Sequence, residues 1–341
     1  MPRVVQFTGP RQVDVTEVPS EPLAAGQVRV RTRYSGISAG TELTAYRGTN
    51  PYLTRTWDPE QRLFTTAADA PSQPYPLVGW GYSEVGEIVE AEDATRVGEQ
   101  VWGIWGHRSE AVLPAEKVRP VPAGLDPLAA AFARVGAVAL NAVLLAEVHL
   151  GERVAVFGQG VIGLLATRLL RCSGAEVVAV DTVAQRRDKA VEFGAAHALE
   201  GDGAAERVRE LGGADVAIDL SGSYRALHEA IRTVVVGGRV VAAGFYQDEG
   251  VGLRLGEEFH HNRIELVSSQ IGGVPPKLSG RWDQDRLNAT FLRQCADGAV
   301  DPTALVTHLL APSEVEHAYR LLDDGAPDVL QIVLDFGQEP T

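Results

Sequence analysis

A glycine-rich turn carries the strongest chemical signal in the sequence. Gly158, Gly160 and Gly163 directly follow the apolar run Val154–Phe157. In such a turn the first glycine permits a tight bend, the second lets the backbone approach a pyrophosphate, and the third lets helix and strand pack closely. The alternative is that the glycines serve only the turn. We expect a dinucleotide site made of Gly158, Gln159, Gly160, Val161, Ile162 and Gly163.

An acidic residue follows the turn at a distance that suits a nucleotide ribose. Asp181 closes a second apolar run, Val177–Val180, and lies 18 residues past Gly163. A carboxylate there can hydrogen-bond both ribose hydroxyls. It also repels a 2′-phosphate, so we expect NAD as the cofactor, with NADP the weaker candidate. Arg186 could receive such a phosphate or stack on adenine, whereas Arg187 is expected on a solvated helix face.

The elements that position this turn alternate between strand and helix. Between residues 153 and 271, β-branched apolar runs are separated by helical spacers, and a buried helix is expected at Leu128–Leu145. This alternation predicts an α/β fold with a doubly wound parallel sheet covered on both faces. Ligands bind at the carboxyl ends of such strands. We therefore place Ser221, Gly222, Gly244 and Phe245 in the same crevice.

The first third of the chain has the pattern of a β domain. Val28–Tyr34 and Val85–Glu90 alternate apolar and polar residues, as half-buried strands do. Short strands separated by glycine and proline predict a small barrel. The proline-rich stretch at 49–76 has no clear period and is expected to form a long ordered loop or lid.

Composition excludes several classes of function. The 341 residues suggest about two domains. With 31 Lys and Arg against 45 Asp and Glu, the net charge is −14, so neither nucleic acid nor a membrane surface is an expected partner. The two cysteines exclude a disulfide framework and a multi-cysteine zinc lobe. No long apolar segment or apolar signal core is visible, so a cytoplasmic location is expected.

Four segments together resemble the medium-chain dehydrogenase/reductase family. Ser35–Glu42 resembles the family loop C-G-I-C-G-T-D, and Gly81–Gly86 resembles G-H-E-x-x-G. Ala133–Leu140 is similar to E-P-L-A-V-A-L, and Gly237–Gly244 is similar to G-G-R-V-V-x-x-G. The resemblance implies a GroES-like β-barrel catalytic domain at 1–132 and 273–341, and a Rossmann dinucleotide-binding domain at 133–272.

The resemblance also implies a contact between copies. The strand at Ile264–Ile271 would be the sheet edge, which in the family pairs with its copy across a two-fold axis, so a homodimer is expected, with a tetramer as the alternative. Three residues at the end of this strand, near the nicotinamide, would then be Ser268, Ser269 and Gln270.

The departures from the family concern a metal. Family alcohol dehydrogenases hold a catalytic zinc with a Cys, a His or Glu pair, and a later Cys or Glu. The corresponding positions here carry Ser38 or Ala39, Tyr82 with Ser83, and Arg134. Zinc prefers thiolate, imidazole or carboxylate, and a guanidinium repels it. We therefore expect a zinc-independent enzyme without a bound metal.

Side-chain hydroxyls are the candidates to replace the metal. Tyr82, with Arg134 as a neighbouring charge, is the expected acid/base. Ser38 and Thr41 lie at or near the vacated positions, Thr41 at a proton-relay position of the family, and Glu42 could orient Thr41. Alternatively, Tyr82 packs inside the barrel and Arg134 forms a salt bridge, for example to Glu42.

The expected reaction is hydride transfer between NAD(H) and a secondary alcohol or its ketone. Aromatic walls suit a small ring-bearing substrate, such as a sugar, a cyclitol or a natural-product alcohol. The S-G-I-S-x-G-T-E loop resembles that of bacteriochlorophyllide dehydrogenases and other zinc-less members. Two alternatives stay open: an enoyl or quinone reductase, and a non-catalytic nucleotide-binding protein. The candidate substrate residues are Tyr46, Tyr52, Trp57, Trp80 and His107, the last also a secondary acid/base candidate.

Overall fold

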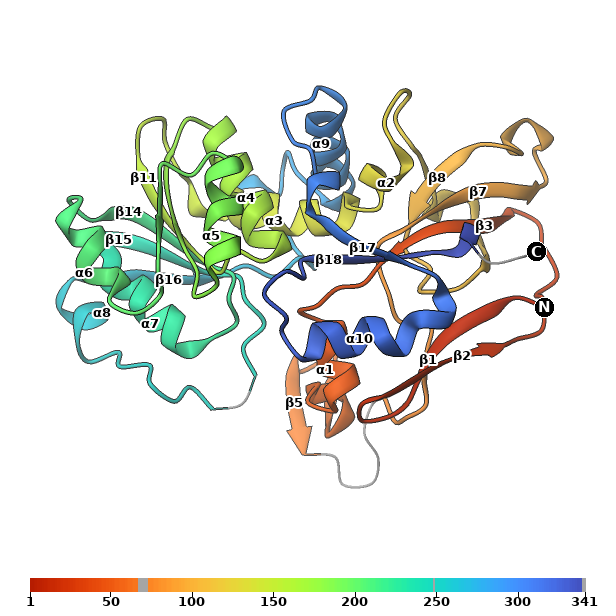
Figure 1. Cartoon of the computed structure of the whole chain (residues 1–341), viewed down its shortest axis with the longest axis horizontal. Helices are drawn as coiled ribbons and strands as arrows, with labels where there is room; N and C mark the ends of the chain where they lie inside the picture. Colours follow the sequence, from red (N-terminus) through yellow and green to blue (C-terminus); the bar gives the residue numbers. More distant parts are fainter. Residues whose placement is uncertain (67–72, 248, 339–341) are drawn as a thin grey trace. The chain divides into compact units, whose positions relative to one another are not determined.

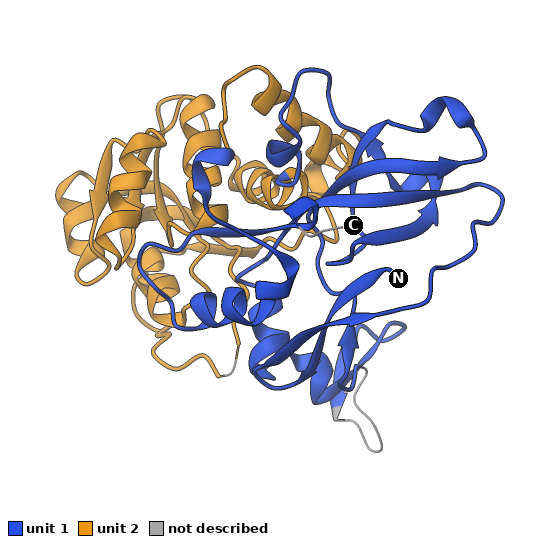
Figure 2. Ribbon diagram, turned by 45° about the vertical axis from the view of Figure 1, so that its right-hand side comes forward, with its two compact units in different colours: residues 1–132, 303–341 blue, residues 133–302 orange. Residues whose placement is uncertain are grey.

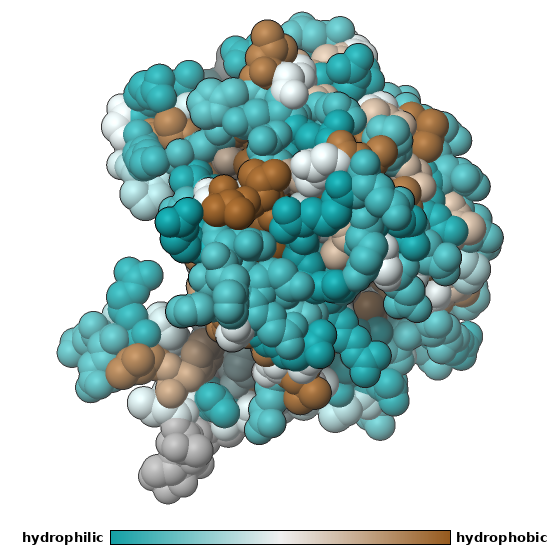
Figure 3. Space-filling model, turned by 90° about the vertical axis from the view of Figure 1, so that its left-hand side faces the viewer, coloured by the Kyte–Doolittle hydropathy of each residue, from teal (hydrophilic) through white to brown (hydrophobic). Residues whose placement is uncertain are grey.

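The computed structural model describes residues 1–66, 73–247 and 249–338, and the chain forms two compact units (Figures 1 and 2). Unit 1 consists of Met1–Phe132 and Thr303–Thr341, and unit 2 of Ala133–Pro302. Within the described residues, no helix is both long and apolar enough to span a bilayer. The face in Figure 3 is mostly hydrophilic, with small apolar areas between, in keeping with the net charge of −14.

Unit 1 is built around the long strand β3 (Gln27–Gly36). The first half of β3 pairs with β9, its second half pairs with β18, and β7 runs along its other side. The main sheet order is β10-β8-β7-β3-β18-β17. Its remaining strands are β7 (Glu84–Ala91), β8 (Gln100–Gly103), β9 (Glu110–Pro114), β10 (Arg119–Pro120), β17 (Val306–Leu310) and β18 (Gln331–Asp335).

The strands predicted from alternation are confirmed in β3 and β7. Val28 and Val30 are buried against Ile88 and Val101, while the intervening Arg29 forms ion pairs with Glu90 and Glu110. A second sheet, β2-β1-β6, covers another core with α1 and α10. These elements, with α2, are β1 (Arg3–Gly9), β2 (Gln12–Glu17), β6 (Leu77–Val78), α1 (Glu42–Arg47), α2 (Pro127–Ala130) and α10 (Val315–Asp323).

The proline-rich stretch at 49–76 contains regular structure that the sequence did not indicate. β4 (Arg55–Asp58) and β5 (Leu63–Thr66) form an antiparallel hairpin, in which the rings of Trp57 and Phe64 lie 4.9 Å apart. The aromatic pair across the strands stabilises the hairpin without a hydrophobic period. Residues 67–72 of this stretch lie outside the described residues.

Unit 2 contains the predicted parallel sheet, with strand order β13-β12-β11-β14-β15-β16. All neighbouring pairs in this order are parallel. β16 is an edge strand, as expected, and its pairing with a second copy remains a proposal. The strands are β11 (Arg153–Phe157), β12 (Glu176–Val180), β13 (His197–Leu199), β14 (Ala214–Asp219), β15 (Val234–Ala242) and β16 (Glu265–Ser268).

Helices cover both faces of this sheet. α6 and α7 pack on the face that carries Ala155 and Phe157, and α3 and α4 take the other face. The predicted helix at Leu128–Leu145 is broken into α2 and α3, which begins at Ala133. The helices are α3 (Ala133–Ala146), α4 (Val161–Cys172), α5 (Ala184–Glu192), α6 (Ala204–Glu210), α7 (Tyr224–Thr233), α8 (Glu258–His261) and α9 (Gln284–Ala296).

Unit 2 extends further than the boundary expected at residue 273. Helix α9 packs so closely on α3 that a Cβ at Gly136 would lie 2.3 Å from the ring of Phe291, which is fully buried. Asn141 donates to the carbonyl of Gly273 at 3.1 Å, and Lys277 pairs with Glu147 at 2.9 Å. These contacts place residues 273–302 with the parallel sheet rather than with the barrel.

The α3–α9 contact predicts a stability change that denaturant unfolding can measure. Phe291→Ala should lower the unfolding free energy by about 3–5 kcal/mol, because it opens a cavity against Gly136. The exposed Val191→Ala on α5 serves as control and should change it by less than about 0.5 kcal/mol. A Phe291→Ala variant as stable as the control would contradict the close packing of α9.

Candidate functional site

The glycine turn at the end of β11 has the geometry that its sequence predicts. Gly158 has φ +84°, and a Cβ at Gly163 would lie 1.8 Å from the carbonyl oxygen of Gly158. Gly160 caps the start of α4, and a Cβ there would meet no described atom within 4 Å. The first and third glycines are therefore fixed by protein contacts, while the backbone at Gly160 is open to a ligand. Val161 and Ile162 follow in the first turn of α4, half-buried.

Asp181 lies at the end of β12 and faces this turn. Its carboxylate accepts the backbone N–H of Gln159 at 2.6 Å and that of Val183 at 2.8 Å. The side chain of Gln159 is fully buried and bonds to Val156 and Thr167, so only its backbone borders the turn. Asp181 is thus held in one orientation beside the glycine turn.

The two arginines after Asp181 differ from each other in their contacts. Arg187 was expected on a solvated helix face. Instead, its Nη1 donates to the carbonyls of Asp181 at 2.9 Å and Thr182 at 3.1 Å, which fixes the chain after β12. Arg186 lies half-buried in the first part of α5.

The loops after β14 and β15 are packed backbone to backbone. A Cβ at Gly244 would lie 2.5 Å from the nitrogen of Gly222, and one at Gly222 would lie 3.1 Å from the carbonyl oxygen of Phe245. Ser221 also approaches the glycine turn, because a Cβ at Gly158 would lie 2.7 Å from its nitrogen. The structure therefore brings the residues predicted at the ends of β14 and β15 together with Gly158.

Asp219 is a residue of this crevice that the sequence reasoning missed. It ends β14 and accepts hydrogen bonds from Ser221 Oγ at 2.7 Å and from the hydroxyl of Tyr246. Burial raises the pKa of its carboxyl to about 6. An aspartate closing an apolar strand is the same signal that identified Asp181.

The predicted residues after β16 have local contacts. Ser269 donates its backbone N–H to the carbonyl of Ala242 at 2.9 Å, and its Oγ lies 3.4 Å from Asn141 Nδ2. Gln270 Oε1 accepts the backbone N–H of Gly272 at 2.5 Å. Ser268 is the last residue of β16. They continue the carboxyl edge of the sheet past β15.

Three hydroxyl side chains meet in unit 1. The hydroxyls of Ser38 and Tyr82 form a short hydrogen bond, and Thr41 Oγ1 lies 3.4 Å from the Tyr82 oxygen. Ser38 is buried and Tyr82 half-buried. Ser38 follows β3, and Tyr82 precedes β7, which pairs with β3, so the sheet register brings them together. This cluster of hydroxyls can hold and exchange a proton.

Glu42 does not orient Thr41 as expected. Its Oε1 accepts the backbone N–H of Ser38 at 2.8 Å. Its Oε2 lies 2.6 Å from His107 Nε2 and accepts the Tyr319 hydroxyl at 2.5 Å. The carboxylate is fully buried, and these donors satisfy it.

Arg134 belongs to the other unit. It lies near the start of α3, and its Nη1 donates to Gln284 Oε1 at 3.0 Å. Its predicted effect on Tyr82 stays a prediction.

The candidate substrate residues differ in how deeply they are buried in unit 1. Tyr46 is buried and stacks on Tyr319, with ring centroids 5.4 Å apart, and His107 is fully buried beneath the hydroxyl cluster. Both are therefore packed within unit 1 rather than presented to a ligand. Trp80 is half-buried and packs edge-on against Phe7. Tyr52 and Trp57 are half-buried around the β4–β5 hairpin and remain candidates.

The donor chemistry at the positions expected to correspond to the family's zinc ligands does not suit zinc. Ser38 and Tyr82 offer hydroxyls there, and zinc in proteins is held by thiolate, imidazole or carboxylate. Among the described residues, one group of potential ligands clusters, made of His228, Glu257 and Glu258 in unit 2. Arg254 lies 3.2 Å from Glu257 and 3.1 Å from His228. A guanidinium thus already occupies the space where a cation would bind.

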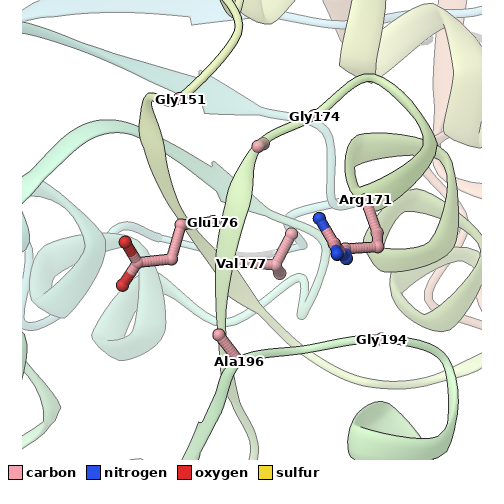
Figure 4. Close-up of a pocket in the computed structure, with 8 residues that line it drawn as sticks. Gly151, Arg171, Gly174, Glu176, Val177, Gly194 and Ala196 are labelled. Atoms are coloured by element: carbon pink, nitrogen blue, oxygen red, sulfur yellow. The ribbon is translucent and has the colours of Figure 1, made fainter.

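A hollow of about 420 Å³ lies at the opposite end of the parallel sheet (Figure 4). Glu176 begins β12 there, whereas Asp181 follows the other end of this strand. Arg171 points toward Val177 in this hollow, while the Glu176 carboxylate points away. The hollow is therefore separate from the dinucleotide turn.

Comparisons with known proteins agree with this geometry. A family model described as zinc-binding dehydrogenase matches residues 161–285. The chain is 30% identical over 336 residues to D-guloside 3-dehydrogenase of Escherichia coli (strain K12), with 94% of this chain and 96% of the relative covered. It is 26% identical over 357 residues to 2-desacetyl-2-hydroxyethyl bacteriochlorophyllide A dehydrogenase of Cereibacter sphaeroides, with 97% of each covered.

The fold also has solved counterparts. The crystal structure of 2R,3R-butanediol dehydrogenase from Bacillus subtilis superimposes with a TM-score of 0.80 at 20% identity, covering 98% of this chain and 99% of that one. The segment matched by the family model includes Gly163 but not Gly158 or Gly160, and it contains neither Ser38 nor Tyr82. The description of that model therefore says nothing about a metal at those positions.

The glycine turn predicts two different outcomes for two alanine substitutions. Gly160→Ala should leave thermal stability unchanged, because its Cβ meets no described atom, yet should weaken NADH binding about ten-fold or more by crowding the pyrophosphate. Gly163→Ala should lower both stability and binding, because its Cβ collides with Gly158. Calorimetric titration and thermal unfolding measure the two effects, and the equally open Gly280→Ala is the control. Unaltered binding in Gly160→Ala would exclude this turn as the site.

Proposed function

Because the chain belongs to the zinc-type medium-chain dehydrogenase/reductase family, we propose that it is an NAD-dependent dehydrogenase of a secondary alcohol on a sugar ring. The D-guloside 3-dehydrogenases, which align with nearly the whole chain, support a glycoside or a related polyol as substrate. The reverse reaction reduces the corresponding ketone. The observation that carries the proposal is the hydroxyl pair Ser38–Tyr82 at the positions that the family resemblance assigns to zinc ligands.

The proposed reaction proceeds without zinc. In alcohol oxidation the substrate hydroxyl must lose its proton as the hydride leaves its carbon. Tyr82 takes this proton as a phenolate and becomes the neutral phenol, and its hydrogen bond to Ser38 fixes the direction in which the phenolic oxygen faces the substrate. In ketone reduction Tyr82 returns the proton to the carbonyl oxygen. Thr41 Oγ1 lies 3.4 Å from the Tyr82 oxygen and supplies a second hydroxyl beside it.

The residues of unit 2 fit NAD. Gly160 leaves room for the pyrophosphate, the start of α4 favours its charge, and Asp181 binds the ribose hydroxyls. When bound, NAD supplies the acceptor for the hydride. The Asp181 carboxylate, held by two backbone N–H groups, cannot turn away from a 2′-phosphate and so disfavours NADP.

Removing the phenolic hydroxyl tests the role of Tyr82. Tyr82→Phe should lower kcat for glycoside oxidation by about 10²–10⁴-fold, the usual contribution of a positioned acid/base, with NADH affinity unchanged. Tyr34→Phe on β3 is the matched control. Turnover is followed by NADH formation with a panel of alkyl glycosides, polyols and cyclitols.

Metal analysis belongs to the same experiment. Wild-type protein dialysed against a chelator should keep its full turnover. Stoichiometric zinc, with activity lost on its removal and regained on its return, would refute the metal-free mechanism. A Tyr82→Phe variant as active as wild type would remove Tyr82 from the reaction.

Cofactor choice provides a separate test. Wild-type kcat/KM should favour NAD over NADP, and Asp181→Asn should reduce this preference about ten-fold by removing the charge that faces the 2′-position. The exposed Asp188→Asn on α5 should leave the ratio unchanged. A wild-type preference for NADP would overturn the assignment.

A further inference from the structure

A chain of buried polar groups lies beneath the Ser38–Tyr82 pair. His107 Nε2 lies 2.6 Å from Glu42 Oε2, and its Nδ1 lies 2.6 Å from Ser35 Oγ. Ser35 Oγ in turn lies 3.2 Å from Glu84 Oε1. Relative exposure is 0% for Glu42, His107 and Ser35 and 1% for Glu84. The chain Glu42–His107–Ser35–Glu84 therefore joins two carboxylates across the interior of unit 1.

The carboxylate at each end of this chain accepts a backbone N–H from one of the two loops that carry Ser38 and Tyr82. The backbone N–H of Ser38 donates to Glu42 at 2.8 Å. The backbone N–H of Ser83, the residue after Tyr82, donates to Glu84 at 3.1 Å. Neither Ser38 nor Tyr82 lies in a strand or helix, so these bonds determine where the two hydroxyls meet.

The imidazole also contacts the loop of Tyr82 directly. Gly81 has φ +124°, and a Cβ there would lie 2.9 Å from His107 Cε1 and 2.8 Å from Glu84 Oε1. The backbone N–H of His107 donates to the carbonyl of Trp80 at 2.9 Å. A smaller or differently shaped side chain at position 107 would therefore let the loop at residues 80–82 move.

A proton on each ring nitrogen of His107 completes the hydrogen bonds between Glu42 and Glu84. Ser35 has one hydroxyl proton and can donate it to Glu84 only if His107 Nδ1 carries its own proton. Burial is the largest single influence and lowers the pKa of His107, but the charge of Glu42, its hydrogen bond to the ring and the charge of Glu84 together outweigh burial and leave that pKa raised. A protonated His107 donates to both Glu42 and Ser35, which gives the buried carboxylates the cation that they need.

We propose that His107 is a positioning residue that acts through the Ser38–Tyr82 pair. The inference rests on the function proposed above. The chain holds geometry and does not conduct the substrate proton, because the backbone N–H of Ser38 that links it to the pair cannot accept one. The groups that face His107 are Glu42 from α1, Ser35 from β3, Glu84 from β7 and, through Glu42, Tyr319 from α10.

A double-mutant cycle with Tyr82 tests the proposal. His107→Phe should lower kcat about 10- to 100-fold through misplacement of Tyr82, with NADH affinity unchanged. In the Tyr82→Phe background, the same substitution should have no further effect on kcat, because the group it positions is gone. His107→Gln, which keeps a donor toward Glu42, should regain part of the loss. Equal, additive losses in both backgrounds would overturn the proposal.

Two further variants complete the test. Thr32 lies on β3, the same strand as Ser35, and its hydroxyl accepts a buried hydrogen bond from Trp105. Thr32→Val removes this bond and should leave kcat unchanged. If His107→Phe fails to fold, Ser35→Ala breaks the chain at its middle and should lower kcat about ten-fold in wild type but not in Tyr82→Phe. An unchanged kcat in Ser35→Ala would refute the positioning role. A fully active Tyr82→Phe would refute the proposed function itself.

Discussion

Two buried carboxylates, Glu42 and Glu84, constrain the structure around the hydroxyl cluster. A charge removed from water costs several kcal/mol unless donors surround it. Glu42 receives its donors from Ser38, His107 and Tyr319, which come from separate segments of unit 1. Glu84 accepts hydrogen bonds from the hydroxyl of Ser35 and from the backbone N–H groups of Ser83 and Trp105, and burial raises the pKa of its carboxyl even so. The loops that carry the hydroxyls are thus ordered by satisfaction of charge rather than by regular secondary structure.

Unit 2 uses aspartates in a related way at the carboxyl edge of its sheet. Asp181 and Asp219 end the strands on either side of β11, and each accepts a backbone N–H from the turn that follows its strand. Asp219 is covered by Tyr246, and burial raises the pKa of its carboxyl to about 6. Asp181 instead faces the glycine turn. One aspartate therefore holds the loops together, while the other lies beside the glycine turn, where we propose that it selects the nucleotide.

Local patterns in the sequence were sufficient to predict the parallel sheet, the glycine turn and the position of Asp181 at the end of a strand. Apolar strand runs, helical spacers and tight turns each depend on residues that are neighbours in the sequence. The buried polar chain could not be found in this way. Glu42 and His107 are 65 positions apart, and Glu42 and Tyr319 are 277 apart, so their contacts depend on how strands pair across unit 1. The glycines at 79, 81 and 106 were the available signal, since each marks a place where a side chain would collide.

The order of the strands has a consequence for biosynthesis. Unit 2 is continuous in the chain, whereas β18 must insert between β3 and β17 to complete the sheet of unit 1. On a translating ribosome, β3 and the Ser38 loop emerge long before β18 and Tyr319 do. The second half of β3 then presents unpaired backbone groups, a state in which strands are prone to association with other chains. Unit 2 can close first, and the hydroxyl cluster is among the last parts of the protein to take shape.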